Sequence, residues 1–214
     1  MNSFVTSWSG GKDSCFAMML AMNAGLKPVA LLNMMNESGN ISRSHGIPKA
    51  ILESQAAMIG LPLLAKSTSW ANYETTFVSA LVQLKEYYKI DSAVFGDIDL
   101  QAHRDWEENV CEFVGLKAWL PLWQQDRKKL VLQMIGAGIE TYIVSCNELM
   151  GPSYLGKKIT PALVDELEAI GVDACGENGE FHTLVVNTPL FRQAIEVTFG
   201  ATLHHGNYWF IEMS

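Results

Sequence analysis

Long hydrophobic runs are missing from this sequence of 214 residues. A membrane-spanning helix needs roughly 20 consecutive apolar residues, and the apolar stretch that ends at Met22 is broken by Asn23 and Gly25. The first residues carry no basic segment followed by an apolar stretch and a cleavage site, as a signal peptide would. We therefore expect a cytoplasmic protein without a membrane partner.

Basic clusters are scarce as well. The chain has 15 Lys and Arg residues against 23 Asp and Glu residues, which gives a net charge of −8, and residues 127–129 form the one visible basic run. Sequence-independent nucleic-acid binding depends on Lys and Arg side chains that neutralise phosphates. The charge balance therefore argues against a nucleic-acid partner.

Cysteine pairs are also absent. Cys15, Cys111, Cys146 and Cys175 lie far apart in the sequence and form no C-x-x-C pair. This spacing argues against a disulfide framework and against a zinc or iron–sulfur site. We expect four reduced, buried thiols.

Strand-like and helix-like segments alternate over the first part of the chain. The predicted strands are 4–8, 28–35, 61–65, 93–97 and 117–123, and the predicted helices between them are 15–22, 48–59, 70–88 and 101–114. This alternation is typical of βαβ units, so we predict an α/β fold with a five-stranded parallel sheet flanked by helices. Ligands of such sheets bind outside the carboxyl ends of the strands, where the following loops converge.

The segment Ser9–Ser14, with the sequence SGGKDS, joins the first predicted strand to the first predicted helix. We expect the N–H groups at the helix start to be unpaired and to carry the positive end of the helix dipole. Adjacent glycines let an anion approach the backbone, and Lys12 adds a positive charge. A Walker loop is excluded because that motif has four residues between its glycines. The segment is therefore predicted to bind phosphate.

This segment resembles the pyrophosphate loop of the ATP-pyrophosphatase superfamily, whose members cleave ATP between the α and β phosphates and adenylate a substrate. The resemblance implies that ATP contacts Ser9, Gly10, Gly11, Lys12, Asp13 and Ser14. Lys12 and Asp13 are the catalytic candidates of the loop, whose main contribution should be electrostatic stabilisation of the departing pyrophosphate. The alternative for Asp13 is to cap the helix or to hold the loop.

Mg²⁺ is the expected metal, because it favours a few carboxylates together with substrate phosphates. Its candidate ligands are Asp13 and Asp97, the second of which ends a predicted buried strand. The alternative for Asp97 is a helix cap or an ion pair with Arg104. Arg104 and Glu107 lie one helical turn apart and are expected to pair on the surface.

Other candidates for nucleotide binding follow the second and fourth predicted strands. Asn33 and Met35 should border the adenine, mainly through their backbone, and Gly96 should lie close to the nucleotide. His45 either faces the phosphates or caps the next helix.

Beyond residue 124 the composition changes, and we divide the chain into a nucleotide-binding domain at 1–124 and a smaller α+β domain at 125–214 that should bind substrate. The predicted elements of the second domain are helices at 126–136 and 161–170, strands at 141–146 and 184–186, and a hairpin of 194–199 with 208–211. Thr160 is a suitable N-cap for its second helix. His204 and His205 should lie exposed in the hairpin turn.

A second chemistry-bearing segment, 176–183, has the sequence GENGEFHT. If it runs as a strand from Glu180, then Glu180 and His182 point to the same face. A carboxylate and an imidazole on one face can orient a nucleophile or exchange a proton, so Glu177, Glu180 and His182 are catalytic candidates. The alternative is a glycine turn that leads into an edge strand with solvated charges.

Together, the two segments make the chain resemble the diphthine–ammonia ligase family. Further matching stretches are 95–98 (FGDI), 103–107 (HRDWE), 121–123 (PLW) and 171–173 (GVD). The resemblance implies a nucleotide domain of the adenine-nucleotide α-hydrolase (HUP) type followed by a substrate-binding domain. Residues 100–104 read LQAHR and look closer to compact prokaryotic members, whose substrate need not be diphthine.

In the family reaction, ATP adenylates the carboxylate of diphthine, a modified histidine of elongation factor 2, and ammonia then displaces AMP. We therefore expect an AMP- and pyrophosphate-forming amide ligase that uses ATP, Mg²⁺, ammonia and a carboxylate acceptor of unknown identity. The sequence is compatible with a homodimer. One alternative is a non-catalytic nucleotide-binding protein. Another is a tRNA-thiolating enzyme, which normally needs paired cysteines.

Overall fold

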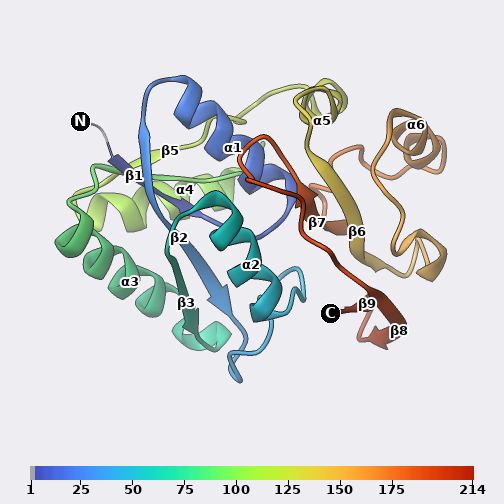
Figure 1. Cartoon of the computed structure of the whole chain (residues 1–214), viewed down its shortest axis with the longest axis horizontal. Coiled ribbons are helices and arrows are strands. Elements are labelled where there is room, and N and C mark those ends of the chain that lie inside the picture. The colour runs from blue at the N-terminus through green and yellow to red at the C-terminus, as the bar shows by residue number, and fades with distance from the viewer. Residues whose placement is uncertain (1–2) are drawn as a thin grey trace.

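A five-stranded parallel sheet occupies the first half of the chain. In the computed structural model, which describes residues 3–214, its strand order is β3-β2-β1-β4-β5 (Figure 1). The strands are β1 (Ser3–Ser7), β2 (Lys27–Met35), β3 (Leu63–Ser67), β4 (Ser92–Val94) and β5 (Lys117–Trp119). Because β1 lies between β2 and β4, the loop that follows β1 sits at the switch point of the sheet, where ligands bind.

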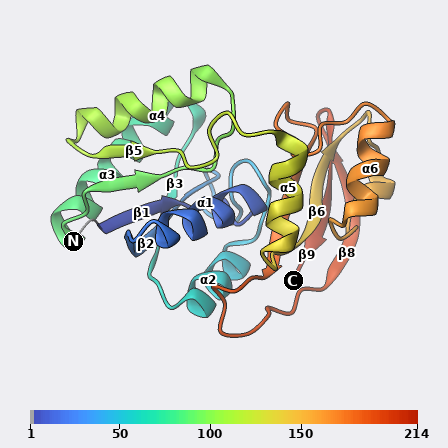
Figure 2. The ribbon, with the colours of Figure 1, turned by 90° about the horizontal axis from the view of Figure 1, so that it is seen from above.

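Helices cover both faces of this sheet. They are α1 (Lys12–Asn23), α2 (Lys49–Ile59), α3 (Tyr73–Tyr88) and α4 (Gln101–Phe113), with a short 3₁₀ turn, η1 (Trp70–Asn72), before α3. Successive residues of β1 point to opposite faces, so Phe4 packs with the buried residues of α1 and α2. Val5 packs with those of α3 and α4 instead. The view from above shows the two helical layers on either side of the sheet (Figure 2).

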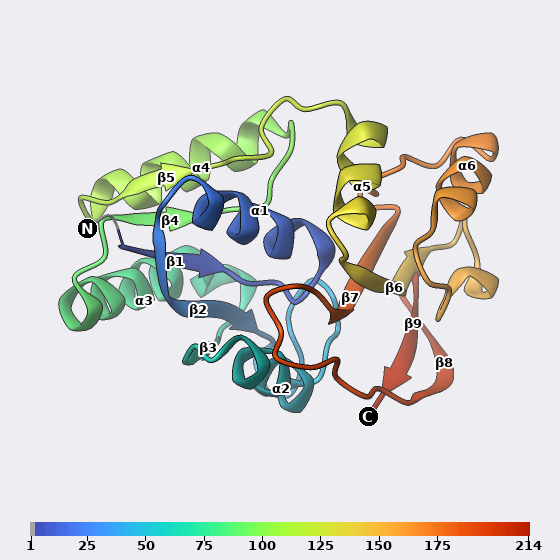
Figure 3. The same cartoon turned by 45° about the horizontal axis from the view of Figure 1, so that its top comes forward.

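A smaller antiparallel sheet lies in the second half of the chain, with the order β7-β6-β9-β8 (Figure 3). Its elements are α5 (Arg127–Gly136), β6 (Glu140–Asn147), η2 (Pro152–Tyr154), α6 (Pro161–Ala169), β7 (Phe181–Asn187), β8 (Phe199–His205) and β9 (Tyr208–Met213). The α/β fold with a smaller C-terminal α+β part is therefore confirmed.

The two sheets share one hydrophobic core. A single cluster of buried residues extends from Phe4 and Phe16 in the first half to Leu130, Val144 and Leu184 in the second. The boundary at residue 124 lies between the two sheets in the chain, and the division into two domains stays a prediction.

Most predicted elements lie where the sequence places them, but the C-terminal hairpin is shifted. Residues 194–199 were expected to pair with 208–211, whereas the partner of β9 is β8, at Phe199–His205. The segment before β8 runs beside β7 instead, where Ile195 N donates to Val186 O (2.9 Å). His204 and His205 are consequently exposed residues of an edge strand, and Gly206 occupies the turn with φ 60°.

Two smaller observations concern helices. Thr160 caps α6 as predicted, since its Oγ1 accepts a hydrogen bond from Leu163 N (3.2 Å). Among residues 3–214, no helix is long and apolar enough to cross a membrane.

Candidate active site

Three glycines shape the loop between β1 and α1 and its surroundings. Gly10 has φ 87°, a left-handed conformation that glycine adopts without steric cost. A Cβ atom at Gly11 would lie 2.5 Å from Cε1 of His45. A Cβ atom at Gly96 would lie 2.7 Å from the backbone of Asp13 and Ser14. Gly96 therefore lets the end of β4 pack directly on the first turn of α1.

The loop is closed by its own hydroxyl groups. The Oγ atoms of Ser9 and Ser14 lie 3.0 Å apart, and Ser9 Oγ also accepts a hydrogen bond from Gly11 N (3.2 Å). Lys12 N donates to Thr183 Oγ1 in β7 (3.1 Å). The expectation that the N–H groups at this helix start are unpaired is therefore wrong for Gly11 and Lys12.

Gln55 of α2 ties the loop to the second sheet. Its side chain is fully buried, and its Oε1 accepts a hydrogen bond from Trp8 Nε1 (2.9 Å). Its Nε2 donates to Gly10 O (3.0 Å) and to Val185 O (2.7 Å). Sequence analysis missed this residue, although a lone polar side chain among the apolar positions of the predicted helix 48–59 was a visible signal.

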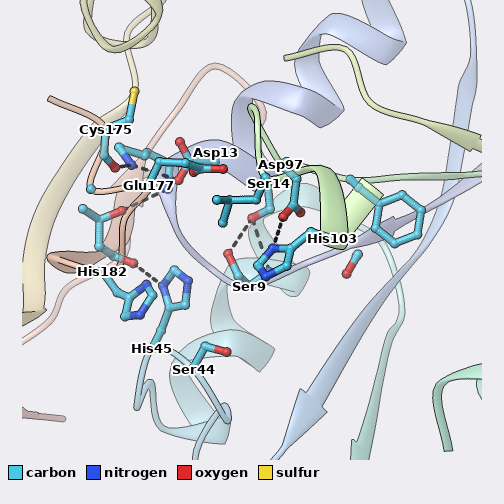
Figure 4. A pocket seen from close by; sticks show the side chains of 18 of the residues that line it. Ser9, Asp13, Ser14, Ser44, His45, Asp97, His103, Cys175, Glu177 and His182 are labelled. Carbon is cyan, nitrogen blue, oxygen red and sulfur yellow. Dashed lines mark hydrogen bonds and ion pairs between the residues drawn. The ribbon is translucent and has the colours of Figure 1, made fainter. Parts of the chain in front are cut away.

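A cavity of about 710 Å³ opens beside this loop and extends to the segment 175–183 (Figure 4). The predicted site residues that line it are Ser9, Lys12, Asp13, Ser14, His45, Gly96, Asp97, Glu177 and His182. Additional lining residues that were not predicted include Trp70, Tyr73, His103, Trp106 and Glu107. The cavity thus brings both chemistry-bearing segments of the sequence to one place.

Lys12 and Asp13 form a buried ion pair at the cavity. Lys12 is 2% exposed, and its Nζ donates to Asp13 Oδ2 (2.9 Å) and to the carbonyl oxygen of Cys175. Burial works to lower the pKa of Lys12, but the Asp13 carboxylate outweighs it and raises that pKa, so the amine stays charged. Burial raises the pKa of Asp13 despite Lys12. Asp13 does not cap α1, because no side chain accepts a hydrogen bond there.

Asp97 and Glu107 form a second pair. Glu107 is 4% exposed, and burial, followed by the neighbouring Asp97 carboxylate, raises its pKa to about 11. The Glu107 carboxyl group is therefore protonated at neutral pH. Burial works to raise the pKa of Asp97, but hydrogen bonds from His103 (2.7 Å) and Glu107 outweigh it and hold that pKa below its ordinary value.

Both pairings expected for Arg104 are wrong. Its Nε donates to Glu108 Oε1 (2.7 Å), four residues along α4, and contacts neither Asp97 nor Glu107 as an ion pair. Glu107 instead shares the buried side of α4 with Val110 and Cys111. Glu107 precedes the apolar residues Val110 and Cys111 by three and four positions, which places all three on one side of a helix. This spacing was the sequence signal for its burial.

Glu177 and Glu180 have different surroundings. Glu177 lines the cavity, where burial and then the carboxylates of Asp13 and Asp97 raise its pKa to about 7. Glu180 lies outside the cavity lining, and its carboxylate accepts hydrogen bonds from Asn178 N (3.0 Å) and Asp173 N (3.3 Å). It folds the glycine-containing turn that presents Glu177, and its direct catalytic role stays a prediction. The expected shared face of Glu180 and His182 depended on a strand that starts at Glu180, whereas β7 begins at Phe181.

Arg127 links this turn to the loop after β4. Its guanidinium forms a two-pronged ion pair with Asp99 (2.8 and 2.6 Å) and donates to Asp173 Oδ2 (2.6 Å). Asp173 Oδ1 accepts from Cys175 N (2.7 Å), while Glu177 Oε1 accepts from Ile98 N (3.0 Å). The loops that carry Asp97 and Glu177 are thereby held together.

His45 and His182 lie side by side on another wall of the cavity (Figure 4). Their ring centroids are 4.5 Å apart, and His45 Nδ1 lies 2.9 Å from Thr183 O. Burial lowers the pKa of His45 to about 4, and burial with the nearby His45 and Lys12 holds that of His182 well below its usual range. His45 does not cap α2, whose N-cap residue is Pro48.

Asn33 and Met35 are not at the cavity. Asn33 is 4% exposed and its Nδ2 donates to Trp8 O (2.7 Å), while Met35 is buried in the core. Both side chains therefore pack inside the fold, and the expected contact of this strand's backbone with adenine stays a prediction. Aromatic rings line the cavity instead, with Tyr73 packed against Trp70 (centroids 5.6 Å apart) and Trp106 (5.7 Å).

The four cysteines are buried and unpaired, as expected. Burial raises the pKa of Cys15, Cys111 and Cys175 to about 12 and that of Cys146 to about 11. Within residues 3–214, no group of three or more His, Cys, Asp or Glu side chains is placed to hold a metal ion by itself.

Comparison with the profiles of known protein families gives two matches. The profile of the diphthamide synthase N-terminal domain matches residues 1–118, and that of the C-terminal domain matches residues 126–214. The chain belongs to the diphthamide synthase family. The expected family is thus confirmed over most of the sequence.

Members of the diphthamide synthase family include close matches in animals. The diphthine–ammonia ligase of Rattus norvegicus is 29% identical over 222 residues, which cover 92% of this chain and 83% of that protein. The Homo sapiens diphthine–ammonia ligase is 28% identical with the same coverage. A solved structure described as a predicted subunit of tRNA methyltransferase from Methanocaldococcus jannaschii is 14% identical, covers 91% of this chain and 100% of its own, and superposes with a TM-score of 0.45.

Proposed function

We propose that this chain is an ATP-dependent amide ligase that forms AMP and pyrophosphate. ATP would adenylate a carboxylate, and ammonia would then displace AMP to give an amide. The observation that carries the proposal is the direct contact of the phosphate loop with residues 175–183. The backbone N–H of Lys12 donates a hydrogen bond to Thr183 Oγ1, and its Nζ donates one to the carbonyl oxygen of Cys175. Adenylation and amide formation need one shared site, and the cavity joins the phosphate loop to the second segment.

The phosphate loop supplies the charge complement for ATP. Lys12 stays protonated in its buried position, and the loop hydroxyls of Ser9 and Ser14 face the cavity. Gly10 and Gly11 let the loop pack closely against α2 and against His45, which fixes the shape of the loop. These groups are positioned before ATP arrives, so they stabilise the leaving pyrophosphate without reorganising.

The donor set at the loop fits Mg²⁺. Asp13 Oδ1 is buried and has no hydrogen-bond partner, which costs free energy unless a cation binds to this oxygen. We propose that Asp13 and Asp97 hold the ion together with phosphate oxygens, a mixed set that Mg²⁺ prefers. When bound, Mg²⁺ would neutralise phosphate charge.

Glu177 is the proposed proton acceptor for the nitrogen nucleophile. A general base works best when its pKa lies near the operating pH, and the pKa of about 7 meets this condition. Glu180 and Arg127 then act as positioning residues, because they hold the turn that carries Glu177.

The names of the related ligases make diphthine on elongation factor 2 the first acceptor to test. The chain would be incubated with ATP, Mg²⁺, ammonium and elongation factor 2 that carries diphthine, and in parallel with a panel of small carboxylic acids. AMP, pyrophosphate and an amide are the expected products. ADP and phosphate as the only products would contradict the proposal, and K12Q, which removes the buried charge, is the inactive control.

The same assay separates the proposal from its two competitors. A non-catalytic nucleotide-binding protein would bind ATP in calorimetry and release no pyrophosphate with any acceptor. A thiolating enzyme needs a thiolate, and burial disfavours that form at all four cysteines. Serine at Cys146 and Cys175 should therefore leave the ligase activity in place.

A further inference from the structure

The adjacent rings of His45 and His182 have no role in the phosphate and carboxylate chemistry described so far. His45 comes from the loop between β2 and α2, and His182 from β7, so the two halves of the chain each contribute one ring. A Cβ atom at Gly11 would lie within 3.0 Å of both Cε1 and Nδ1 of His45, which places this ring directly against the phosphate loop. The pair therefore lies beside the position proposed for the ATP phosphates.

The tautomer of His45 is fixed by its partner. Nδ1 lies 2.9 Å from the carbonyl oxygen of Thr183, and a carbonyl only accepts, so Nδ1 carries the proton and donates it. A neutral imidazole has one donor and one acceptor nitrogen, which leaves Nε2 of His45 with a free lone pair. His182 is neutral as well and adds a second imidazole to the same wall.

The part of the cavity wall formed by His45 and His182, here called the histidine wall, differs in charge from the part formed by Asp97 and Glu177. Asp97 and Glu177 line the cavity and attract cations, including ammonium. The histidine wall carries no negative charge, and the positive charge of Lys12 acts on both of its rings. Ammonium has no lone pair and cannot attack a carbonyl carbon, whereas ammonia has one and donates N–H hydrogen bonds to neutral acceptors. The histidine wall therefore favours the binding of ammonia, the nucleophilic form, over ammonium.

We propose that His45 and His182 form the binding site for free ammonia in the amide-forming step, an inference that rests on the proposed function. Ammonia donates to the imidazole lone pairs, and its own lone pair attacks the acyl carbon of the adenylate. The C–N bond forms, the C–O bond to AMP breaks, and the surplus proton of the nitrogen leaves through water to the Glu177 carboxylate.

Nuclear magnetic resonance of the full chain tests ammonia binding without any acceptor. The side-chain nitrogens of histidine are labelled with ¹⁵N, and ammonium chloride is added at mildly alkaline pH, where part of it is ammonia. Tetramethylammonium chloride, which cannot donate a hydrogen bond, is the matched salt. Shifts at His45 and His182 with the first salt alone support the proposal, with exposed His205 as the internal control. Equal chemical shifts of His45 and His182 with both salts overturn the proposed ammonia site, whatever the ligase assay shows.

Kinetics with the acceptor found in the ligase assay gives a second readout. H182L removes one acceptor, so the KM for ammonia should rise about tenfold, the effect of one lost hydrogen bond. H182Q restores a hydrogen-bond acceptor and should bring the KM for ammonia most of the way back to the wild-type value. In H182L the KM for ammonia should change by a larger factor than the rate of acid-dependent exchange of pyrophosphate into ATP without ammonium, and H205L, on the exposed edge strand, should leave both at the wild-type value.

The two readouts keep the two proposals apart. Wild-type protein that shows no acid-dependent exchange with any acceptor contradicts the ligase function, while the resonance experiment still decides the ammonia site. Exchange that falls together with amide formation in H182L contradicts the ammonia site and leaves the ligase function standing.

Discussion

At the scale of single residues, the site depends on Gln55 as much as on the phosphate loop itself. Its amide joins Trp8, Gly10 and Val185, which belong to three separate segments. The residue is fully buried, so water cannot replace any of these hydrogen bonds.

Leucine at this position keeps the volume and removes all three hydrogen bonds. Q55L should lower the free energy of unfolding by about 3 kcal/mol or more, because it leaves buried donors and acceptors unsatisfied. Urea unfolding measures the effect. The exposed Gln133 gives the matched control, since Q133L should change stability by less than about 0.5 kcal/mol. Equal stability of the two variants would refute the bracing role of Gln55.

Glu107 makes stability depend on pH in a defined direction. Its folded pKa of about 11 lies above the ordinary value of 4.5, so the native state binds more protons than the unfolded state between these limits. Stability is then full below the ordinary value and falls as pH rises, by at most about 1.4 kcal/mol per pH unit.

E107Q imitates the protonated side chain and removes this dependence. Its advantage in unfolding free energy over the wild type should grow between mildly acidic and mildly alkaline pH. Metal-free urea titrations at several pH values measure the difference, and E112Q on the exposed side of α4 controls for the loss of one charge. A difference that stays constant as pH rises would show that Glu107 is ionised in the native state, as it is in the unfolded state.

The roles of site residues could be predicted from the sequence where the interacting residues are neighbours in the chain. The phosphate loop could be read directly because β1, the glycine turn and α1 follow one another in the chain. The roles of Gln55, Glu107 and Arg127 depend on segments that meet only after folding. Asn33 shows the converse case, since a polar residue at the end of a strand faces inward to Trp8.

At the scale of elements, strands and helices were predicted well where their apolar patterns are strong. The C-terminal hairpin was misplaced because 194–199 alternates like a strand, although β8 is almost wholly exposed and has little pattern of its own. Edge strands of this kind are held by pairing with β9 and leave few signals in the sequence.

The loops around the cavity are held by the Arg127 ion pairs. R127Q removes the charge and both carboxylate contacts, so the segment 173–180 should exchange amide hydrogens faster while β6 keeps its protection. Amide formation should slow as Glu177 loses its fixed position. Hydrogen exchange with mass spectrometry measures the first effect, and K129Q, on the exposed side of α5, is the control. Unchanged exchange in 173–180 would exclude Arg127 as a positioning residue.

At the scale of the whole molecule, both sheets contribute to one core and to one phosphate loop. Phe16 and Val144 belong to the same buried cluster, and Val185 N donates to Gly10 O (2.9 Å). Two sheets that share a buried cluster are expected to unfold as a unit.

Calorimetry should therefore show a single thermal transition for the full chain, with equal calorimetric and van't Hoff enthalpies. Near-ultraviolet and far-ultraviolet circular dichroism should give the same midpoint. A fragment of residues 1–124 lacks the contacts of Thr183 and Val185 with the loop and should bind ATP at least about tenfold more weakly. Two resolved transitions, or full ATP affinity in the fragment, would mean that the halves are independent.

The bracing of the phosphate loop by β7 also has a consequence for synthesis on the ribosome. The SGGKDS segment leaves the ribosome long before its supports at Thr183 and Val185, because Thr183 follows Lys12 by 171 residues. A nascent chain that already carries the complete parallel sheet therefore has an unfinished nucleotide site. The nucleotide site therefore gains its full set of contacts only after β7 has been synthesised.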